Sequence, residues 1–229
     1  MSDSNHSNQL KTIVVLISGS GSNLQAIIDG VANGEIPARI AAVISNKADA
    51  FGLERARKAG IETRVISHTA FDSREEFDDN LAGIIDSYSP DIIVLAGFMR
   101  ILTSRFVNRY PGKMINIHPS LLPKYQGLNT HQRAIDDGAS EHGATVHLVT
   151  AELDGGPPIL QAKVRLSENE TAQSLAARVL EKEHIIFPKV IAWMAQEKLD
   201  ITNNTILFEN KAIPETGLLL DAGLLLDSE

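Results

Sequence analysis

The chain has 229 residues, of which 43% are apolar and 22% are charged, and its formal net charge is −8. This composition is typical of a globular protein with a real core and excludes disorder of the whole chain. The lack of cysteine excludes disulfides, thiolate catalysis and Cys-based zinc sites, and the lack of a Lys/Arg run favours a small-molecule partner over nucleic acid.

The first ten residues are polar, with neither a basic start nor an apolar stretch. We therefore expect no signal peptide, and no run in the chain is long and apolar enough to predict a membrane span. The sequence predicts a disordered N-terminal tail over residues 1–11 and a cytoplasmic protein.

Strands and helices alternate after this tail. Short β-branched or apolar runs predict buried strands at residues 12–18, 40–44, 63–66, 91–96 and 113–118. Helical spacing of apolar residues predicts helices at residues 24–34, 52–59, 73–87 and 102–110. This alternation indicates the α/β class, with a doubly wound, mostly parallel sheet and helices on both faces.

The pattern changes after His118. A loop with two prolines, a short helix around residues 131–137 and two strands at 144–150 and 159–166 follow. The connection between these strands is too short for a helical crossover, so the pair should be antiparallel. A long amphipathic helix is expected from about residue 171 to residue 196.

No linker of domain-boundary quality interrupts this pattern, which indicates one domain over residues 12–212. Residues 213–229 are expected to form a C-terminal tail. The tail holds a near-repeat at residues 217–221 and 223–227, which would pack on the domain or on another molecule.

A glycine-rich loop that contains Gly19 and Gly21 joins the first strand to the first helix. Backbone N–H groups at a helix start are unpaired and the helix dipole is positive there, so the loop can hold an anion. It is not the dinucleotide fingerprint, because Leu24 stands where the third glycine belongs, and no Gly-Lys-Ser/Thr follows to make a P-loop. The alternative is a tight turn in which Ser22 or Asn23 caps the helix.

Asn116 and His118 end a predicted strand at the same edge of the sheet. Side chains alternate along a strand, so these two face the same way. A carboxamide beside an imidazole suits a carbonyl oxygen that gains negative charge in a tetrahedral intermediate, and histidine is the usual general acid or base near neutral pH. The alternative is a polar cap over the end of the strand.

Asp154 lies in the turn that precedes Gly155 and Gly156. If this turn folds over the edge of the sheet, the Asp154 carboxylate can meet His118, favour its charged ring and orient its proton. Asn116, His118 and Asp154 would then form a constellation for acyl or formyl transfer. The alternative is a solvated Asx-turn.

No serine occupies a nucleophile elbow, which favours direct transfer between two bound substrates without an acyl-enzyme. The other histidines do not form a pair four residues apart with an acid on a predicted helix, so no metal site is expected. His142 and His147 lie five positions apart, an odd offset, near the start of a strand and should point apart.

Five segments together resemble the phosphoribosylglycinamide formyltransferase family, the folate-dependent formyltransferases of purine synthesis. They are residues 17–24, 45–52, 95–102, 115–123 and 152–156, and the match spans roughly residues 12–212 in consistent order. The Asn-x-His and Asp-Gly-Gly motifs mark the wider formyltransferase superfamily, and the Ser-Gly-x-Gly-Ser-Asn loop is more specific to this family. The resemblance implies the formyltransferase fold.

The resemblance also implies an activity. The enzyme would transfer the formyl group of 10-formyltetrahydrofolate, a co-substrate, to the amine of 5-phosphoribosylglycinamide in de novo purine (IMP) synthesis, without a metal. Asn116 and His118 would stabilise the oxyanion of the tetrahedral intermediate, with His118 as the proton donor. Asp154 would support the charged His118 ring and help relay protons through water.

Binding residues follow from the same resemblance. The residues matched to phosphoribosylglycinamide contacts are Gly21, Ser22, Asn23 and Glu183. The residues matched to folate contacts are Arg74, Met99, Arg100, Ile101, Leu102 and Asn116, and the turn around residues 150–154 would close over the pterin. Both implied partners are small molecules, with no nucleic acid and no membrane, and a homodimer is left open.

Three residues depart from the family pattern: Ser20 stands where Asn is frequent, Gln126 where Pro is expected, and Asn129 where His is expected. They affect loop detail and leave the catalytic set intact. The leucine-rich segment after about residue 213 lies outside the resemblance.

Three other functions compete with this interpretation. Formyltetrahydrofolate hydrolase has the same catalytic set and uses water as the acceptor, but normally carries an added N-terminal regulatory domain. Methionyl-tRNA formyltransferase holds tRNA with an added C-terminal domain, whereas residues 200–229 here contain six acids and one lysine. A non-catalytic nucleotide or folate sensor would not require Asn116, His118 and Asp154 together.

Overall fold

The computed structural model describes residues 10–202 and 205–220, and its main sheet has the strand order β11-β7-β6-β5-β4-β1-β2-β3. The strands of this sheet are β1 (Lys11–Ile17), β2 (Ala38–Ser45), β3 (Glu62–Val65), β4 (Ile92–Leu95), β5 (Met114–His118), β6 (Glu141–Leu148), β7 (Pro158–Arg165) and β11 (Leu218–Leu219). The helices are α1 (Ser22–Ala32), α2 (Phe51–Lys58), α3 (Arg74–Ser87), α4 (Ser104–Val107), α5 (Thr130–Asp136) and α6 (Ala172–Ala195), with a 3-10 turn η1 (His68–Ala70).

Strand directions in this sheet agree with the predicted topology. β3, β2, β1, β4 and β5 run parallel, whereas β6 runs antiparallel to both β5 and β7. The chain moves outward from β1 to β3 and then returns to β4 on the other side of β1. The carboxyl edge between β1 and β4 is therefore a topological switch point, where open α/β sheets bind their ligands.

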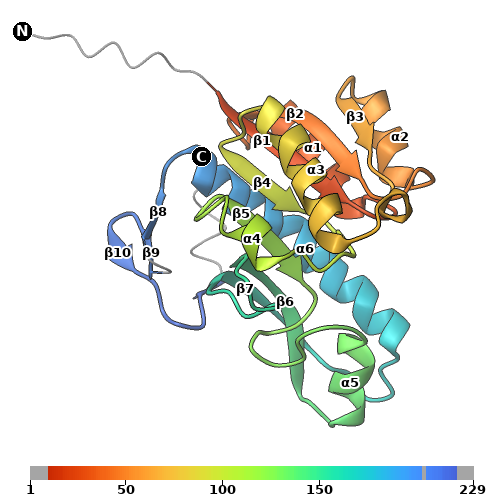
Figure 1. The fold of residues 1–229 in the computed structure, drawn as a ribbon. Helices are drawn as coiled ribbons and strands as arrows, with labels where there is room; N and C mark the ends of the chain where they lie inside the picture. The colour runs from red at the N-terminus through yellow and green to blue at the C-terminus, as the bar shows by residue number, and fades with distance from the viewer. Residues whose placement is uncertain (1–9, 203–204, 221–229) are drawn as a thin grey trace, which may run out of the picture.

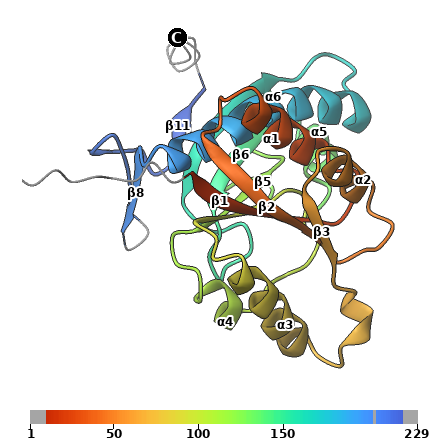
Figure 2. The same ribbon diagram turned by 90° about the horizontal axis from the view of Figure 1, so that it is seen from above.

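Helices cover both faces of the sheet, as Figures 1 and 2 show. In β1, the side chains of Ile13, Val15 and Ile17 pack into one apolar core, which α1, α2 and α6 cover. Val14 and Leu16 pack into a second core, which α3 and α4 cover. A strand that is buried on both faces needs an unbroken apolar run, and this explains the sequence of β1.

One predicted helix is shorter than expected. The sequence predicted a helix over residues 102–110, whereas α4 covers only Ser104–Val107. The Thr103 side chain accepts the Phe106 N–H and caps the helix, while the Thr103 N–H donates to Asp78 at 2.7 Å. Because hydrogen bonds fix both the side chain and the backbone N–H of Thr103, the helix begins after this residue.

The C-terminal part adds strands that the sequence analysis did not predict. β8 (Leu199–Thr202), β9 (Thr205–Phe208) and β10 (Lys211–Ala212) form a small antiparallel sheet beside the main one (Figure 1). β11 pairs in parallel with β7, and the Leu220 N–H donates to the Gln161 carbonyl at 2.8 Å. Part of the expected C-terminal tail thus lies in the main sheet.

The expected tails fall mostly outside the described residues. This holds for residues 1–9 of the N-terminal segment and for the second copy of the near-repeat, residues 223–227. β1 already begins at Lys11. Across residues 10–202 and 205–220, no helix combines the length and the apolarity needed to cross a membrane.

Candidate active site

Three strand ends bring the predicted site segments together. β1, β4 and β5 are neighbours, with Leu16 beside Leu95 and Leu95 beside Asn116. Because these strands are parallel, the loops that follow them leave the same edge of the sheet. The glycine loop, the loop over residues 97–103 and the Asn116–His118 strand end therefore start side by side.

The His118 ring is held at both nitrogens. Its Nδ1 atom lies 3.4 Å from Asp154 Oδ2, and its Nε2 atom lies 2.9 Å from the Tyr125 carbonyl oxygen. The side chains of His118 and Asp154 are only 7% and 8% exposed. Since a carboxylate and a carbonyl can only accept, a proton on either ring nitrogen has an acceptor, and the ring orientation is fixed. The two residues that the sequence could not place together are thus in contact.

The turn that carries Asp154 is docked on the loop after His118. Asp154 Oδ2 accepts a hydrogen bond from the Gly127 N–H at 3.0 Å. The Asp154 backbone carbonyl accepts one from the Gln126 side-chain amide at 3.2 Å. Gln126, which departs from the family pattern, therefore makes one of the docking bonds. Asp154 has a φ of 51°, in the left-handed region that aspartate tolerates better than most residues.

Gly156, two residues after Asp154, occupies a position where only glycine fits. A Cβ atom at this position would lie 1.9 Å from the Leu148 carbonyl oxygen, a backbone atom at the end of β6. Only glycine lets the turn pass this close to the strand. At Gly155 a Cβ atom would meet only the side chain of Glu152, at 2.5 Å. The close passage at Gly156 is what brings Asp154 back to His118.

His147 also belongs to this cluster, although the sequence analysis did not include it. It lies opposite Asn116 on the antiparallel strand β6, with its Nε2 atom 3.2 Å from Asn116 Nδ2 and 3.8 Å from Asp154 Oδ1. The signal that could have found it is the pairing of β5 with β6, which needs the register as well as the strand limits.

The contacts of His147 define its tautomer. Its Nδ1 atom lies 2.8 Å from the Leu148 carbonyl, which can only accept, so the proton is on Nδ1 and Nε2 accepts from Asn116. Burial lowers the pKa of His147 to about 4, which keeps the ring neutral near pH 7. The Asn116 amide is thereby oriented, and its second Nδ2 hydrogen can donate to a substrate oxygen.

His142 has other partners than His147, in line with the expectation that the two side chains point apart, and its ring lies against that of Tyr125. Its Nε2 atom lies 3.2 Å from His131 Nδ1 on α5, and burial lowers its pKa to about 4. In the described part of the chain, no three His, Cys, Asp or Glu side chains gather as a metal-binding group.

We expect the protein to lose thermal stability as the solution becomes acidic. Burial lowers the pKa of both His142 and His147 from 6.5 to about 4. Between these values the unfolded chain binds more protons than the folded chain, so the free energy of unfolding falls as the pH falls through this window. Burial also lowers the pKa of His131 and His184, which adds to this effect. Glu183 acts in the opposite sense, because burial raises its pKa, but the four histidines outweigh one carboxyl group.

Calorimetry should therefore give a melting midpoint at least about 5 °C lower at about pH 4.5 than at about pH 7. A His142→Gln variant removes one of the histidines whose pKa is lowered to about 4 and should lose less stability over the same range. A loss in the variant as large as in the parent protein would contradict this explanation.

The glycine loop forms the start of α1. Gly21 is the N-cap, with a φ of 69°, and it has no side-chain capping bond. The alternative in which Ser22 or Asn23 caps the helix is therefore wrong. The Gly52 N–H donates to the Gly19 carbonyl at 3.0 Å, and a Cβ atom on Gly21 would lie 2.6 Å from the Gly52 Cα atom. The loop thus packs closely on α2 and presents the open N–H groups of α1.

Glu183 reaches this loop from α6. Its Oε2 atom accepts a hydrogen bond from Asn23 Nδ2 at 2.6 Å, and Glu183 is 7% exposed. Burial raises the pKa of the Glu183 carboxyl group. Asn23 Oδ1 is also buried and has no hydrogen-bond partner among the described residues. The predicted phosphoribosyl contacts from two distant segments therefore meet at one place.

The residues expected to contact folate lie on two neighbouring segments. Met99 and Ile101 expose 64% and 53% of their surface, whereas Leu102 is buried. The Arg100 guanidinium lies 4.9 Å from the centre of the Phe77 ring on α3. Arg74 is exposed at the start of α3, three residues before Phe77 and so on the same face of the helix. Both arginines therefore lie on the Phe77 side of α3.

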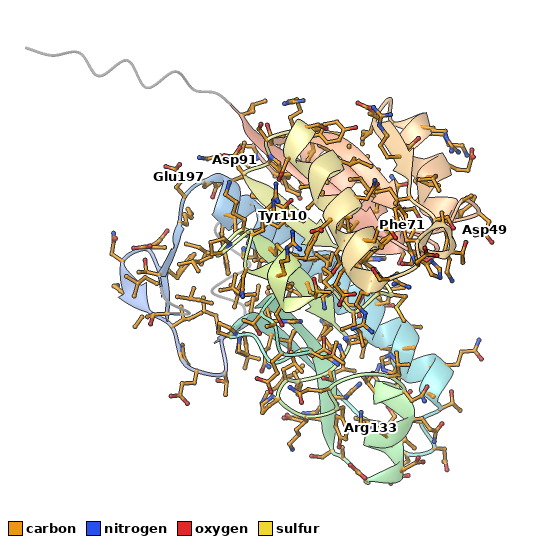
Figure 3. All side chains as sticks on the ribbon, in the orientation of Figure 1. Asp49, Phe71, Asp91, Tyr110, Arg133 and Glu197 are labelled. Atoms are coloured by element: carbon orange, nitrogen blue, oxygen red, sulfur yellow. The ribbon has the colours of Figure 1, made fainter. Side chains whose placement is uncertain are left out.

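A recess of about 260 Å³ lies at the opposite, amino edge of the sheet. Asp91 and Glu197, labelled in Figure 3, are among its lining residues, and Lys11 pairs with Glu197 at 2.6 Å. None of the predicted site residues lines this recess. The candidate active site is therefore the carboxyl edge, where the catalytic cluster and the glycine loop lie.

The fold and the residues at this edge define a formyl transferase. The formyl transferase family model matches residues 11–191, and the chain belongs to this family. Phosphoribosylglycinamide formyltransferase of Escherichia coli (strain K12) is 54% identical over 209 residues, which cover 91% of this chain and 99% of the relative. Its counterpart in Haemophilus influenzae is 50% identical over 208 residues, covering 91% and 98%.

A solved structure gives the same result. The phosphoribosylglycinamide formyltransferase of Coxiella burnetii superimposes with a TM-score of 0.90 at 50% identity, covering 93% of this chain and 100% of that one. The family resemblance and the fold predicted from the sequence are both confirmed.

Proposed function

We propose that this protein transfers the formyl group of 10-formyltetrahydrofolate to the primary amine of 5-phosphoribosylglycinamide, as a step of de novo purine synthesis in the cytoplasm. The observation that carries the proposal is the contact of His118 with Asp154, beside Asn116, at the carboxyl edge of a formyl transferase fold. The names of the most similar relatives support the choice of substrates.

The acceptor would bind at the glycine loop. Its phosphate would take the open N–H groups of Gly21, Ser22 and Asn23, where the dipole of α1 favours an anion. Glu183 would accept hydrogen bonds from the ribose hydroxyls. With the phosphate held there, the glycinamide amine can extend along the sheet edge from β1 toward β5.

The formyl donor would bind between the loop over residues 97–103 and the start of α3. Backbone groups of Met99–Leu102 would border the pterin, and Arg74 would pair with the carboxylates of the folate. Asn116 would contact both the donor and the reacting carbonyl.

Transfer needs no covalent enzyme intermediate. The amine nitrogen forms a bond to the formyl carbon, and the carbonyl electron pair moves onto the oxygen, which accepts hydrogen bonds from Asn116 and His118. The oxyanion then re-forms the carbonyl as the bond from carbon to N10 of the folate breaks, and N10 keeps the electron pair of that bond and takes a proton. The amine loses a proton in the same process, which His118, Asp154 and water can relay. The products are the formamide and tetrahydrofolate.

The assay that tests this function follows tetrahydrofolate release from 10-formyltetrahydrofolate, with and without 5-phosphoribosylglycinamide. We expect release only when the amine is present, with one formamide formed for each tetrahydrofolate. Release that does not depend on the amine would contradict the proposal and favour a hydrolase. Tight folate binding without release under either condition would favour a sensor.

A further inference from the structure

A buried chain of hydrogen-bonded polar groups starts at Ser18, the first residue of the Ser-Gly-x-Gly-Ser-Asn loop. The Ser18 hydroxyl donates to Asn46 Oδ1 at 2.5 Å and accepts the Met99 N–H at 2.8 Å. Asn46 Nδ2 lies 3.4 Å from His68 Nδ1. Ser18 and Asn46 are each 4% exposed. The chain thus connects the ends of β1 and β2 with the loop over residues 97–103 and with η1.

The direction of each bond in this chain is fixed. The Met99 amide can only donate, so the Ser18 oxygen accepts from it and passes its own hydrogen to Asn46 Oδ1. Asn46 Nδ2 is then left to donate to His68. Removing one member would leave another polar group buried without a partner, which is costly. The chain therefore holds its four segments at fixed positions.

One of these segments is assigned to folate by the proposed function, and another, η1, leads directly into the start of α3, which is also assigned to folate. Met99 lies in the loop whose backbone would border the pterin, and its side chain is 64% exposed. His68 lies in η1, a few residues before Arg74 and α3. The far end of the loop is held separately, because Thr103 N–H donates to Asp78 Oδ2 at 2.7 Å. Ser18 and Asp78 thus fix the loop at two amides, and between them the Ile101 side chain is 53% exposed and can meet a ligand.

We propose that Ser18 and Asn46 are positioning residues that set the spacing between the two segments that bind the formylated folate. This inference rests on the proposed function and gives a role to Asn46 in the 45–52 motif. Neither side chain needs to touch the substrates. Ser18 Oγ acts through the Met99 backbone, and Asn46 acts through Ser18 and His68.

Replacing Ser18 with alanine should raise KM for 10-formyltetrahydrofolate about tenfold, the usual effect of losing one buried hydrogen bond. We expect kcat and KM for 5-phosphoribosylglycinamide to change by less than about threefold, because the catalytic cluster and the glycine-loop backbone keep their own contacts. Ser45→Ala is the matched control. Ser45 is also buried at the end of β2, but its hydroxyl bonds only to the Lys47 backbone, where it donates to the carbonyl and accepts the N–H, so the KM values of this variant should stay near those of the parent protein.

A double-mutant cycle tests whether Ser18 and Asn46 act as one unit. Asn46→Ala alone should also raise KM for the folate, and the double variant should show about the larger single effect instead of the product of the two. Independent, multiplying effects would overturn the inference. So would an unchanged KM in a folded Ser18→Ala variant, or an equal rise in the Ser45→Ala control.

Hydrogen exchange gives a readout that does not need turnover. The Met99 amide should exchange at least about tenfold faster in Ser18→Ala than in the parent protein, while the Thr103 amide, held by Asp78, should be unchanged. Equal Met99 rates in the two proteins would contradict the positioning role. If the parent protein exchanged as expected but transferred no formyl group, the proposed function would fail and the hydrogen-bonded chain would stand.

Discussion

Replacing His118 with alanine is expected to lower kcat by about three orders of magnitude or more, while the protein still binds 10-formyltetrahydrofolate. The His118 ring is the group that can both donate a hydrogen bond to the oxyanion and give up a proton. Nδ1 keeps Asp154 as its partner at 3.4 Å, whereas Nε2, which lies 2.9 Å from the Tyr125 carbonyl oxygen, must exchange this acceptor for the substrate oxygen. Alanine removes the proton and the hydrogen bond together, and Asn116 cannot replace the proton.

Single-turnover kinetics and a fluorescence titration with the folate would measure these two effects separately. His131→Gln is the matched control, because His131 contacts His142 at 3.2 Å instead of Asp154 or Asn116, and kcat should stay within a few-fold. A His118→Ala protein that keeps more than about a tenth of its turnover would disprove the role given to His118.

The second large effect is expected at Gly156, a residue that carries no functional group. Gly156→Ala should lower kcat about a hundredfold with little change in KM for the phosphoribosyl substrate. The added Cβ atom would lie 1.9 Å from the Leu148 carbonyl oxygen, which cannot retreat because the N–H of the same peptide unit, that of Val149, donates to the Met114 carbonyl on β5 at 2.9 Å. The turn must lift instead, and Asp154 then moves away from His118.

Gly155→Ala provides the comparison for this experiment. The Cβ atom there would meet only the exposed side chain of Glu152, which can rotate away, so kcat should fall by less than about fivefold. Steady-state kinetics and a melting curve on both variants would settle the matter. Similar kcat values for the two variants would show that the close passage at Gly156 does not control the position of Asp154.

Much of the fold could be predicted because the signals are local. The buried strand at Ile92–Leu95 is an unbroken apolar run, and Ser73 caps α3 by accepting the Glu76 N–H. The small sheet of β8, β9 and β10 was not predicted, since its strands have only four, four and two residues and are partly exposed, so that even the alternation of apolar and polar residues in β8 is too short to be a signal. β11 has only two residues, which is too short for any periodic signal.

The candidate site also has a part that the sequence predicts and a part that it does not. The shared face of Asn116 and His118 follows from alternation along one strand, which the sequence states directly. The contact with Asp154 depends on a glycine that passes close to a strand end, and the place of His147 depends on the register between β5 and β6. Both are distances between segments far apart in the chain, so a single sequence does not specify them.

β11 also has a consequence for the order in which the molecule is completed during synthesis. Ribosomes make chains from the N-terminus, and domains begin to fold as they emerge. The outer edge of β7, at Leu160 and Gln161, therefore stays unpaired until about sixty further residues have been synthesised, when Leu218 and Leu220 can pair with it. A nascent chain stalled before residue 217 would display this uncovered strand edge, which is a surface that chaperones or other nascent chains can bind.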